Sequence, residues 1–145
     1  MSYLVKDYMR KDIVAADEAV SVLEASKTML NKDIDYVIVL TKGQPVGILT
    51  SHDIVMEAVA KDKNPAKLRI SEIMSSPLIG VDPDADVQDA VKTMVEHSIR
   101  TLAVVRDNIL YGTLGSRDLA KHFNKYSERV TTDIVRAMSH VSIPF

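Results

Sequence analysis

A repeat with a constant offset of 65 residues is the feature that most restricts how this chain can fold. Aligned with itself at that offset, the sequence matches without a gap between residues 5–54 and 70–119. The identical pairs include Met9/Met74, Gly47/Gly112, Leu49/Leu114 and Asp53/Asp118. Chance does not give a match that also preserves glycines and acids, so residues 1–60 and 66–125 are interpreted as two copies of one unit. Residues 61–65, which are polar and end in proline, form the predicted linker.

The first copy predicts a helix, two strands and a second helix, in that order. Apolar residues at helical spacing follow Asp17, which is expected to cap the first helix. Residues 36–40 are continuously apolar, as a buried strand would be, and a turn leads from them to a second strand over residues 46–49. Thr50 then opens a helix that is expected to run to about residue 60.

The second copy predicts the same elements at the same offset. Its helix is expected over residues 85–97, its strands over 102–105 and 111–114, and its last helix from Ser116. A short extended segment, residues 13–15 and 78–80, precedes the helix of each unit, so the expected order is a short β, then α–β–β–α. One unit with a two-stranded sheet and two helices closes its core poorly, so the two are expected to pack on each other with pseudo-twofold symmetry. The predicted fold class is therefore α+β.

Composition removes several classes of protein. The chain of 145 residues has no cysteine, which excludes disulfide frameworks, thiolate zinc sites and cysteine nucleophiles. Its net charge of −2 gives no general attraction to nucleic acid. The apolar runs are too short for a membrane span, and early charges argue against a signal peptide, so a soluble cytoplasmic protein is expected.

The junction between the second strand and the last helix carries the strongest local motif. It reads Gly47-Ile48-Leu49-Thr50-Ser51-His52-Asp53 in the first copy. One interpretation is structural, because Thr50 and Asp53 can form a capping box. The other is functional, because a helix N-terminus attracts phosphate and an aspartate can accept hydrogen bonds from a ribose diol.

Other polar groups do not form a recognisable metal or catalytic site. The acids Asp82, Asp84 and Asp86 resemble the start of a calcium loop, but Val87 and Thr93 stand where its glycine and glutamate belong. They are interpreted as an acidic helix N-terminus. The four histidines lack ligand spacing, and no nucleophile elbow or phosphate-binding loop is present, so no metal and no enzymatic activity are expected.

These motifs resemble those of cystathionine β-synthase (CBS) domains. The resemblance rests on Gly-x-x-Thr-x-x-Asp opening a helix in the first copy and on its counterpart Gly-x-x-Gly-x-x-Asp in the second. It rests also on the openings Val5-Lys6-Asp7-Tyr8-Met9 and Ile70-Ser71-Glu72-Ile73-Met74. It covers nearly all of the two copies. It implies a stand-alone tandem CBS module that binds an adenosine compound between the motifs, namely AMP, ADP, ATP, S-adenosylmethionine or NAD, as a regulatory ligand and not as a catalytic cofactor.

The resemblance also implies which residues bind. Asp53 and Asp118 would hold ribose hydroxyls, and Thr50 would contact phosphate or the ligand's polar tail. His52 would lie beside it, either in contact with phosphate or as a solvated residue of the first helical turn. The adenine would be flanked by Ile13, Val14 and Ala15 in one site and by Leu78, Ile79 and Gly80 in the other. Backbone groups at Tyr36 and Val37, and at Thr101 and Leu102, would read the base edge.

The two implied sites differ. Gly115 stands where the family prefers a hydroxyl, although Ser116 follows it and Arg100 and Arg117 can supply charge for a phosphate. The first site therefore has the better pattern, and the second is open to a more highly charged ligand. An alternative is a non-catalytic interaction protein with vestigial clefts.

The expected assembly is a homodimer that acts on a regulated protein partner, without membrane or nucleic acid. Residues 126–145 do not belong to the repeat. A short helix is expected over residues 133–139, and the apolar chain end is expected to dock on the module or on a partner subunit.

Overall fold

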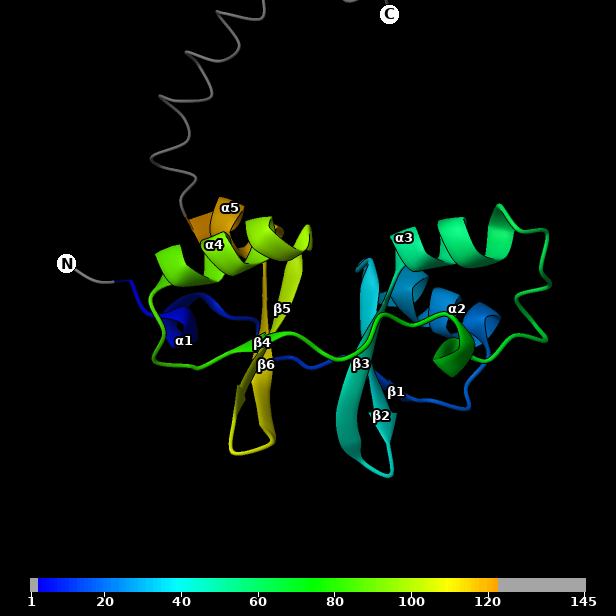
Figure 1. Cartoon of the computed structure of the whole chain (residues 1–145), viewed down its shortest axis with the longest axis horizontal. Coiled ribbons are helices and arrows are strands. Elements are labelled where there is room, and N and C mark those ends of the chain that lie inside the picture. Colours follow the sequence, from blue (N-terminus) through cyan, green and yellow to red (C-terminus); the bar gives the residue numbers. More distant parts are fainter. Residues whose placement is uncertain (1–2, 123–145) are drawn as a thin grey trace, which may run out of the picture.

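The computed structural model describes residues 3–122, which form two similar groups of helices and strands lying side by side (Figure 1). The first group consists of β1 (Ala15–Asp17), α2 (Val22–Lys32), β2 (Tyr36–Thr41), β3 (Gln44–Thr50), α3 (Ser51–Ile54) and the π-helical turn η1 (Val55–Val59). The second consists of β4 (Gly80–Val81), α4 (Val87–His97), β5 (Thr101–Arg106), β6 (Ile109–Gly115) and α5 (Ser116–His122). Short helices precede each group: α1 (Val5–Tyr8) and the 3-10 helix η2 (Ile70–Glu72). The α+β class and the duplicated unit are confirmed.

Each sheet has three strands, and the order β–α–β–β–α expected for each unit is confirmed. The extended segment before each helix adds a strand parallel to the first hairpin strand, giving the orders β1-β2-β3 and β4-β5-β6. Ala15 pairs with Ile38 and Gly80 with Ala103, so the two registers match at the 65-residue offset. These strands begin two residues later than the extended segments expected at residues 13 and 78. By pairing with the hairpin, each short extended segment widens the sheet from two strands to three.

The first residues of the long helices are held by local side chains. Ser21 caps α2 by accepting from the Glu24 N–H at 3.1 Å, and Asp86 caps α4 by accepting from the Gln88 N–H at 2.8 Å. Asp17 was wrongly expected in this role. The chain is still in β1 at that residue, and the Asp17 carboxylate instead accepts from the Ala19 N–H in the following turn.

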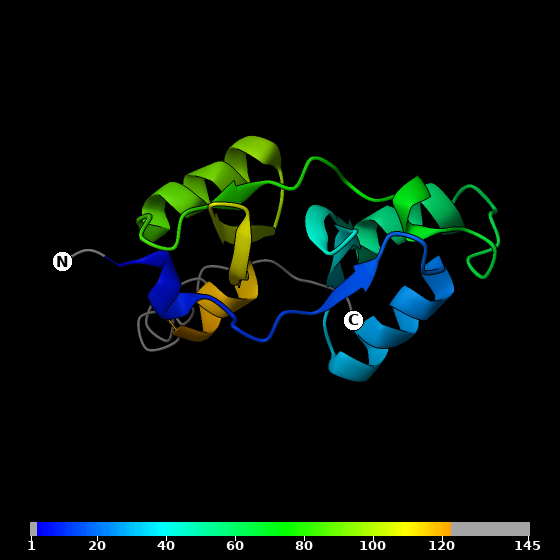
Figure 2. The same cartoon turned by 90° about the horizontal axis from the view of Figure 1, so that it is seen from below.

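The opening segments of the two copies are exchanged between the cores. Val5 is fully buried with Ala90, Leu102 and other second-unit residues, whereas Ile70 is fully buried in the cluster around β2, β3 and α2. Figure 2 shows the blue segment after α1 and the green segment before β4 passing between the units. Each hydrophobic core is therefore completed by a piece that belongs in sequence to the other copy.

Backbone hydrogen bonds join the units symmetrically. Ile48 and Ser75 exchange two hydrogen bonds of 3.0 and 2.9 Å, and Arg10 and Thr113 exchange two of 2.7 and 3.0 Å. Both residues of one pair lie 65 positions from their counterparts in the other. The pseudo-twofold symmetry expected from the repeat is confirmed by this match.

The acidic turn before α4 forms ion pairs with Arg106 and Lys6. Arg106 donates to Asp82 at 3.0 and 2.6 Å and to Asp84 at 2.6 Å, and Lys6 also pairs with Asp84. Hydrogen bonds from Arg106 hold the pKa of both carboxyls below the ordinary value. Of the three acids expected at the helix N-terminus, only Asp86 caps it, because the other two are held by Arg106 and Lys6.

Among residues 3–122, no helix is long and apolar enough to cross a membrane. The helix expected over residues 133–139 and the docking of the chain end lie outside the described residues.

Candidate ligand-binding cleft

A cleft of about 310 Å³ lies between the two units, at the low end of the volumes of small-molecule sites. The start of β2 and the preceding turn form one wall, and the start of β5, the end of β6 and α5 form the other. Six residues expected in binding sites line it together. They are Tyr36, Arg100, Thr101, Ser116, Arg117 and Asp118.

The carboxylate of Asp118 is positioned by the turn from β6 into α5. Its Oδ2 accepts from the Gly115 N–H at 2.8 Å, and no other hydrogen bond from residues 3–122 reaches this side chain. A Cβ at position 115 would lie 3.4 Å from both Asp118 Oδ2 and Thr101 Oγ1. Glycine at 115 therefore holds the carboxylate through its backbone and leaves the space beside it open.

Tyr36 lines the cleft and connects the two sheets. Its hydroxyl hydrogen-bonds the hydroxyl of the buried Thr113 at 2.6 Å across the unit boundary. Burial raises the pKa of the Tyr36 phenol, and the opposing charges of Arg10 and Asp118 act on the same group. The phenol is therefore neutral at pH 7, and its position depends on how the two units are arranged.

Asp53, the counterpart of Asp118, has both oxygens engaged. The expected capping box with Thr50 is confirmed: the Asp53 N–H donates to Thr50 Oγ1 at 3.1 Å, and the Thr50 N–H donates to Asp53 Oδ2 at 3.0 Å. Ser75 Oγ donates to the remaining Asp53 Oδ1 at 3.0 Å. Arg10 occupies the position equivalent to Ser75 in the other half, and it makes no such bond to Asp118.

The other expected site residues do not line this cleft. Val14, Val37 and Leu102 are buried in the two cores, and Ile79 packs against the second of them. Ile13, Ala15, His52 and Gly80 are exposed, and Leu78 is half-buried. Val14 and Ile79 each accept a hydrogen bond through the carbonyl oxygen, from the N–H of Ile38 and of Ala103.

Sequence reasoning missed several residues of the cleft. They are Arg10, Asp33, Ile34, Asp35 and Lys121, with Gly115 treated only as a departure from the motif. A comparison of charge at repeat-equivalent positions could have pointed to three of them. In the 65-residue alignment, Arg10 is equivalent to Ser75, Asp35 to Arg100 and Lys121 to Met56. No group of three or more potential metal-ligating residues occurs within residues 3–122.

A family model described as the CBS domain matches the chain twice, over residues 5–60 and 70–125. The chain belongs to the CBS-domain family. Pairs of CBS domains are regulatory ligand-binding modules, and those that stand alone are generally non-catalytic.

Relatives of this CBS pair differ in length. The CBS domain-containing protein YhcV of Bacillus subtilis is 29% identical, and the match covers 96% of this chain and 97% of that protein. An uncharacterized protein, MK0525, of Methanopyrus kandleri is 35% identical, and the match covers 74% of this chain but only 55% of that protein.

Solved structures share the arrangement of the two motifs. The CBS domain pair of protein MJ0100, in complex with 5′-methylthioadenosine and S-adenosyl-L-methionine, has a TM-score of 0.78 at 30% identity, covering 87% of this chain and 99% of that one. A conserved protein from Pyrococcus horikoshii has a TM-score of 0.79 at 24% identity, covering 84% and 92%. The second similarity shows the fold alone.

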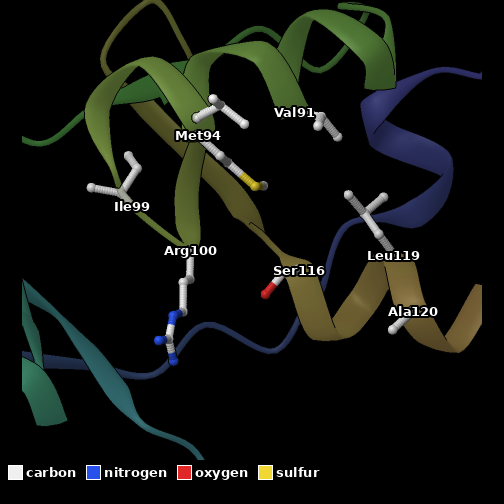
Figure 3. A pocket seen from close by; sticks show the side chains of 8 residues that line it. Val91, Met94, Ile99, Arg100, Ser116, Leu119 and Ala120 are labelled. Atoms are coloured by element: carbon white, nitrogen blue, oxygen red, sulfur yellow. The ribbon is translucent and has the colours of Figure 1, made fainter. Parts of the chain in front are cut away.

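An apolar groove of about 520 Å³ lies on the helical face of the second CBS motif (Figure 3). Val91, Met94, Leu119 and Ala120 line it, while the guanidinium of Arg100 points away from these side chains. Val95, also in its lining, is 74% exposed, and its counterpart Leu30 on α2 is 79% exposed. Equivalent helices of both motifs thus carry an exposed apolar side chain, Leu30 and Val95, in the described part of the chain.

Proposed function

We propose that this CBS pair is a regulatory module that binds an adenosine compound in the cleft beside Asp118. The observation that carries the proposal is the Asp118 carboxylate, which is fixed at one oxygen by Gly115 and faces a cleft with its other oxygen unbonded among residues 3–122. A carboxylate held in this way can accept hydrogen bonds from a ribose diol. The MJ0100 pair, solved with two adenosine compounds, supports the ligand class.

We propose the Asp118 site as the main one, although the sequence pattern favours the site of Asp53. A ligand that used Asp53 Oδ1 would first have to displace the Ser75 hydroxyl. Breaking that hydrogen bond costs part of the binding free energy, whereas Asp118 has no such competitor among the described residues. The remaining implied contacts, including those of Ile13–Ala15 and Leu78–Gly80, stay predictions.

Regulation would follow from the position of the cleft between the motifs. A ligand held by Asp118 and Tyr36 touches both units, so it favours the relative arrangement in which these walls are correctly spaced. The ligand can shift the equilibrium between two arrangements by as much as its binding free energy differs between them. The favoured arrangement would then act on a partner protein or on assembly. We propose binding without catalysis; location in the cytoplasm stays a prediction.

Thermal unfolding with AMP, ADP, ATP, S-adenosylmethionine, NAD and adenosine tests the proposal. A ligand at 100 times its dissociation constant stabilises the folded state by about 2.7 kcal/mol, which raises Tm by about 2–4 °C for each kcal/mol. Asp118→Asn is expected to weaken binding by about 10- to 100-fold, because it removes charge-assisted hydrogen bonds. Asp89→Asn, an equal charge change on the exposed surface of α4, is the control. Absence of any shift at millimolar concentration, or an equal effect of both variants, would contradict the proposal.

We also propose that a second copy of the chain covers the apolar helical faces, which would make the protein a homodimer. Leu30 and Val95 are repeat-equivalent and both exposed, so one twofold-related copy can cover both faces at once. A cyanobacterial CBS-CP12 protein, with a TM-score of 0.78 at 24% identity, is hexameric. These faces would serve equally in an interaction protein with vestigial clefts.

Light scattering at micromolar concentration measures this assembly. The natural sequence is expected to give the mass of a dimer, and Leu30→Asp with Val95→Asp the mass of a monomer, because burying unpaired carboxylates is costly. Ile109→Asp, at an exposed hairpin residue, should remain dimeric. A monomer mass for the natural sequence would exclude the dimer.

A further inference from the structure

Comparison of the two halves position by position reveals a difference in charge at the cleft. Three cations on the Asp118 side, together with Arg10, correspond in the other half to residues without a fixed positive charge. The equivalent pairs are Arg100/Asp35, Arg117/His52, Lys121/Met56 and Arg10/Ser75. All four cations line the cleft. The duplication otherwise preserves the backbone, so the difference lies in the side chains.

Three of these cations are not neutralised by neighbouring acids. Arg10 pairs with Asp12 at 3.2 Å, but no ion pair within 4.0 Å involves Arg100, Arg117 or Lys121 in the described part of the chain. All three belong to the Asp118 wall of the cleft. The carboxylates of Asp33 and Asp35 belong to the opposite wall, at the end of α2 and before β2. The cleft is thus polarised, with an acidic and a basic wall.

We infer that the cleft selects an adenosine ligand with a polyanionic tail, a 5′-diphosphate or triphosphate, over neutral or cationic tails. The inference rests on the proposed function, because Asp118 is taken to fix the ribose. The 5′ substituent of a ribose held at Asp118 starts within one sugar ring of that carboxylate, and Arg100, Arg117 and Lys121 line the same wall of the cleft. Guanidinium and ammonium groups are the natural partners of phosphate oxygens. The sulfonium and ammonium of S-adenosylmethionine would meet like charge there.

Titration calorimetry with adenosine, 5′-methylthioadenosine, S-adenosylmethionine, AMP, ADP and ATP tests the inference. ADP and ATP are expected to bind at least tenfold more tightly than adenosine, and their affinity, unlike that of adenosine, should fall as salt rises. In the variant Arg117→His with Lys121→Met, which inserts the residues of the other half, ADP and ATP should lose about tenfold or more at pH 8. Tenfold corresponds to about 1.4 kcal/mol. The affinity for adenosine should stay within about twofold.

The control variant Lys27→Met with Lys92→Met removes the same charge from the exposed surfaces of α2 and α4 and should bind like the natural sequence. The inference is wrong, and the proposed function stands, if adenosine binds but ADP and ATP bind no more tightly than adenosine. The same holds if ADP and ATP keep their full affinity in the Arg117/Lys121 variant. Tighter binding of S-adenosylmethionine than of ADP would overturn it as well. If no adenosine compound binds, the proposed function fails with it.

Discussion

Replacing Ile70 with alanine is expected to lower the free energy of unfolding by about 2–5 kcal/mol, the usual cost of emptying a buried isoleucine site. Ile70 is fully buried, in a cluster otherwise built mainly from α2, β2 and β3. Its N–H also donates to the carbonyl of Val20 at 2.9 Å. The side chain therefore stabilises the first CBS motif, although it belongs in sequence to the second.

Native-state hydrogen exchange with chemical denaturation measures this effect. The loss of protection in Ile70→Ala should be at least as large in β2 and β3 as in β5 and β6, because the cavity opens in the first core. Ile109→Ala, at a side chain that is 55% exposed, should change stability by no more than about 0.5 kcal/mol. Loss of protection confined to β5 and β6 would show that Ile70 supports its own copy.

Replacing Gly112 with alanine is expected to destabilise the protein by about 1–3 kcal/mol and to weaken ligand binding. A Cβ at this position would collide with the carbonyl oxygen of Arg10. The strand cannot simply move away, because Arg10 and Thr113 exchange two backbone hydrogen bonds. Since Arg10 lines the cleft, a shift of this pair also displaces part of the proposed binding site.

The control variant Gly43→Ala separates the loss of stability from the loss of ligand affinity. Gly43 has φ of +78° and nothing within 4 Å of an added Cβ, so alanine there costs about 1–2 kcal/mol in backbone strain without touching the cleft. Chemical denaturation should show both variants destabilised, while titration with the ligand should show reduced affinity only for Gly112→Ala. Unchanged stability and affinity in Gly112→Ala would mean that the contact between the units yields easily.

The exchange of opening segments makes the two motifs structurally dependent on each other. Neither core is complete without a segment from the other copy, and the cleft lies where the two meet. A ligand bound in this cleft, as proposed, would therefore be coupled to packing in both motifs.

Much of the fold follows from local features of the sequence. The repeat at offset 65, the hairpin strands and the capping box of Thr50 and Asp53 depend on apolar periodicity and on contacts within a few residues, so they could be predicted. The short extended segments in front of the helices could be predicted too, but not their exact bounds or their parallel pairing as β1 and β4, because a three- or two-residue strand is defined by its partner. The boundaries of the copies at residues 60 and 66 stay a prediction.

The candidate site divides in the same way. By itself, the sequence determined which side chains are available: an aspartate in each copy, and cations in only one. Tertiary structure alone decided that Ser75 engages Asp53 while Asp118 keeps an oxygen unbonded within the described residues, and that Tyr36 and Asp35 face Arg100 and Asp118 across one cleft. The physical reason is that these contacts join residues far apart in the chain, and their distances exist only after the two motifs pack.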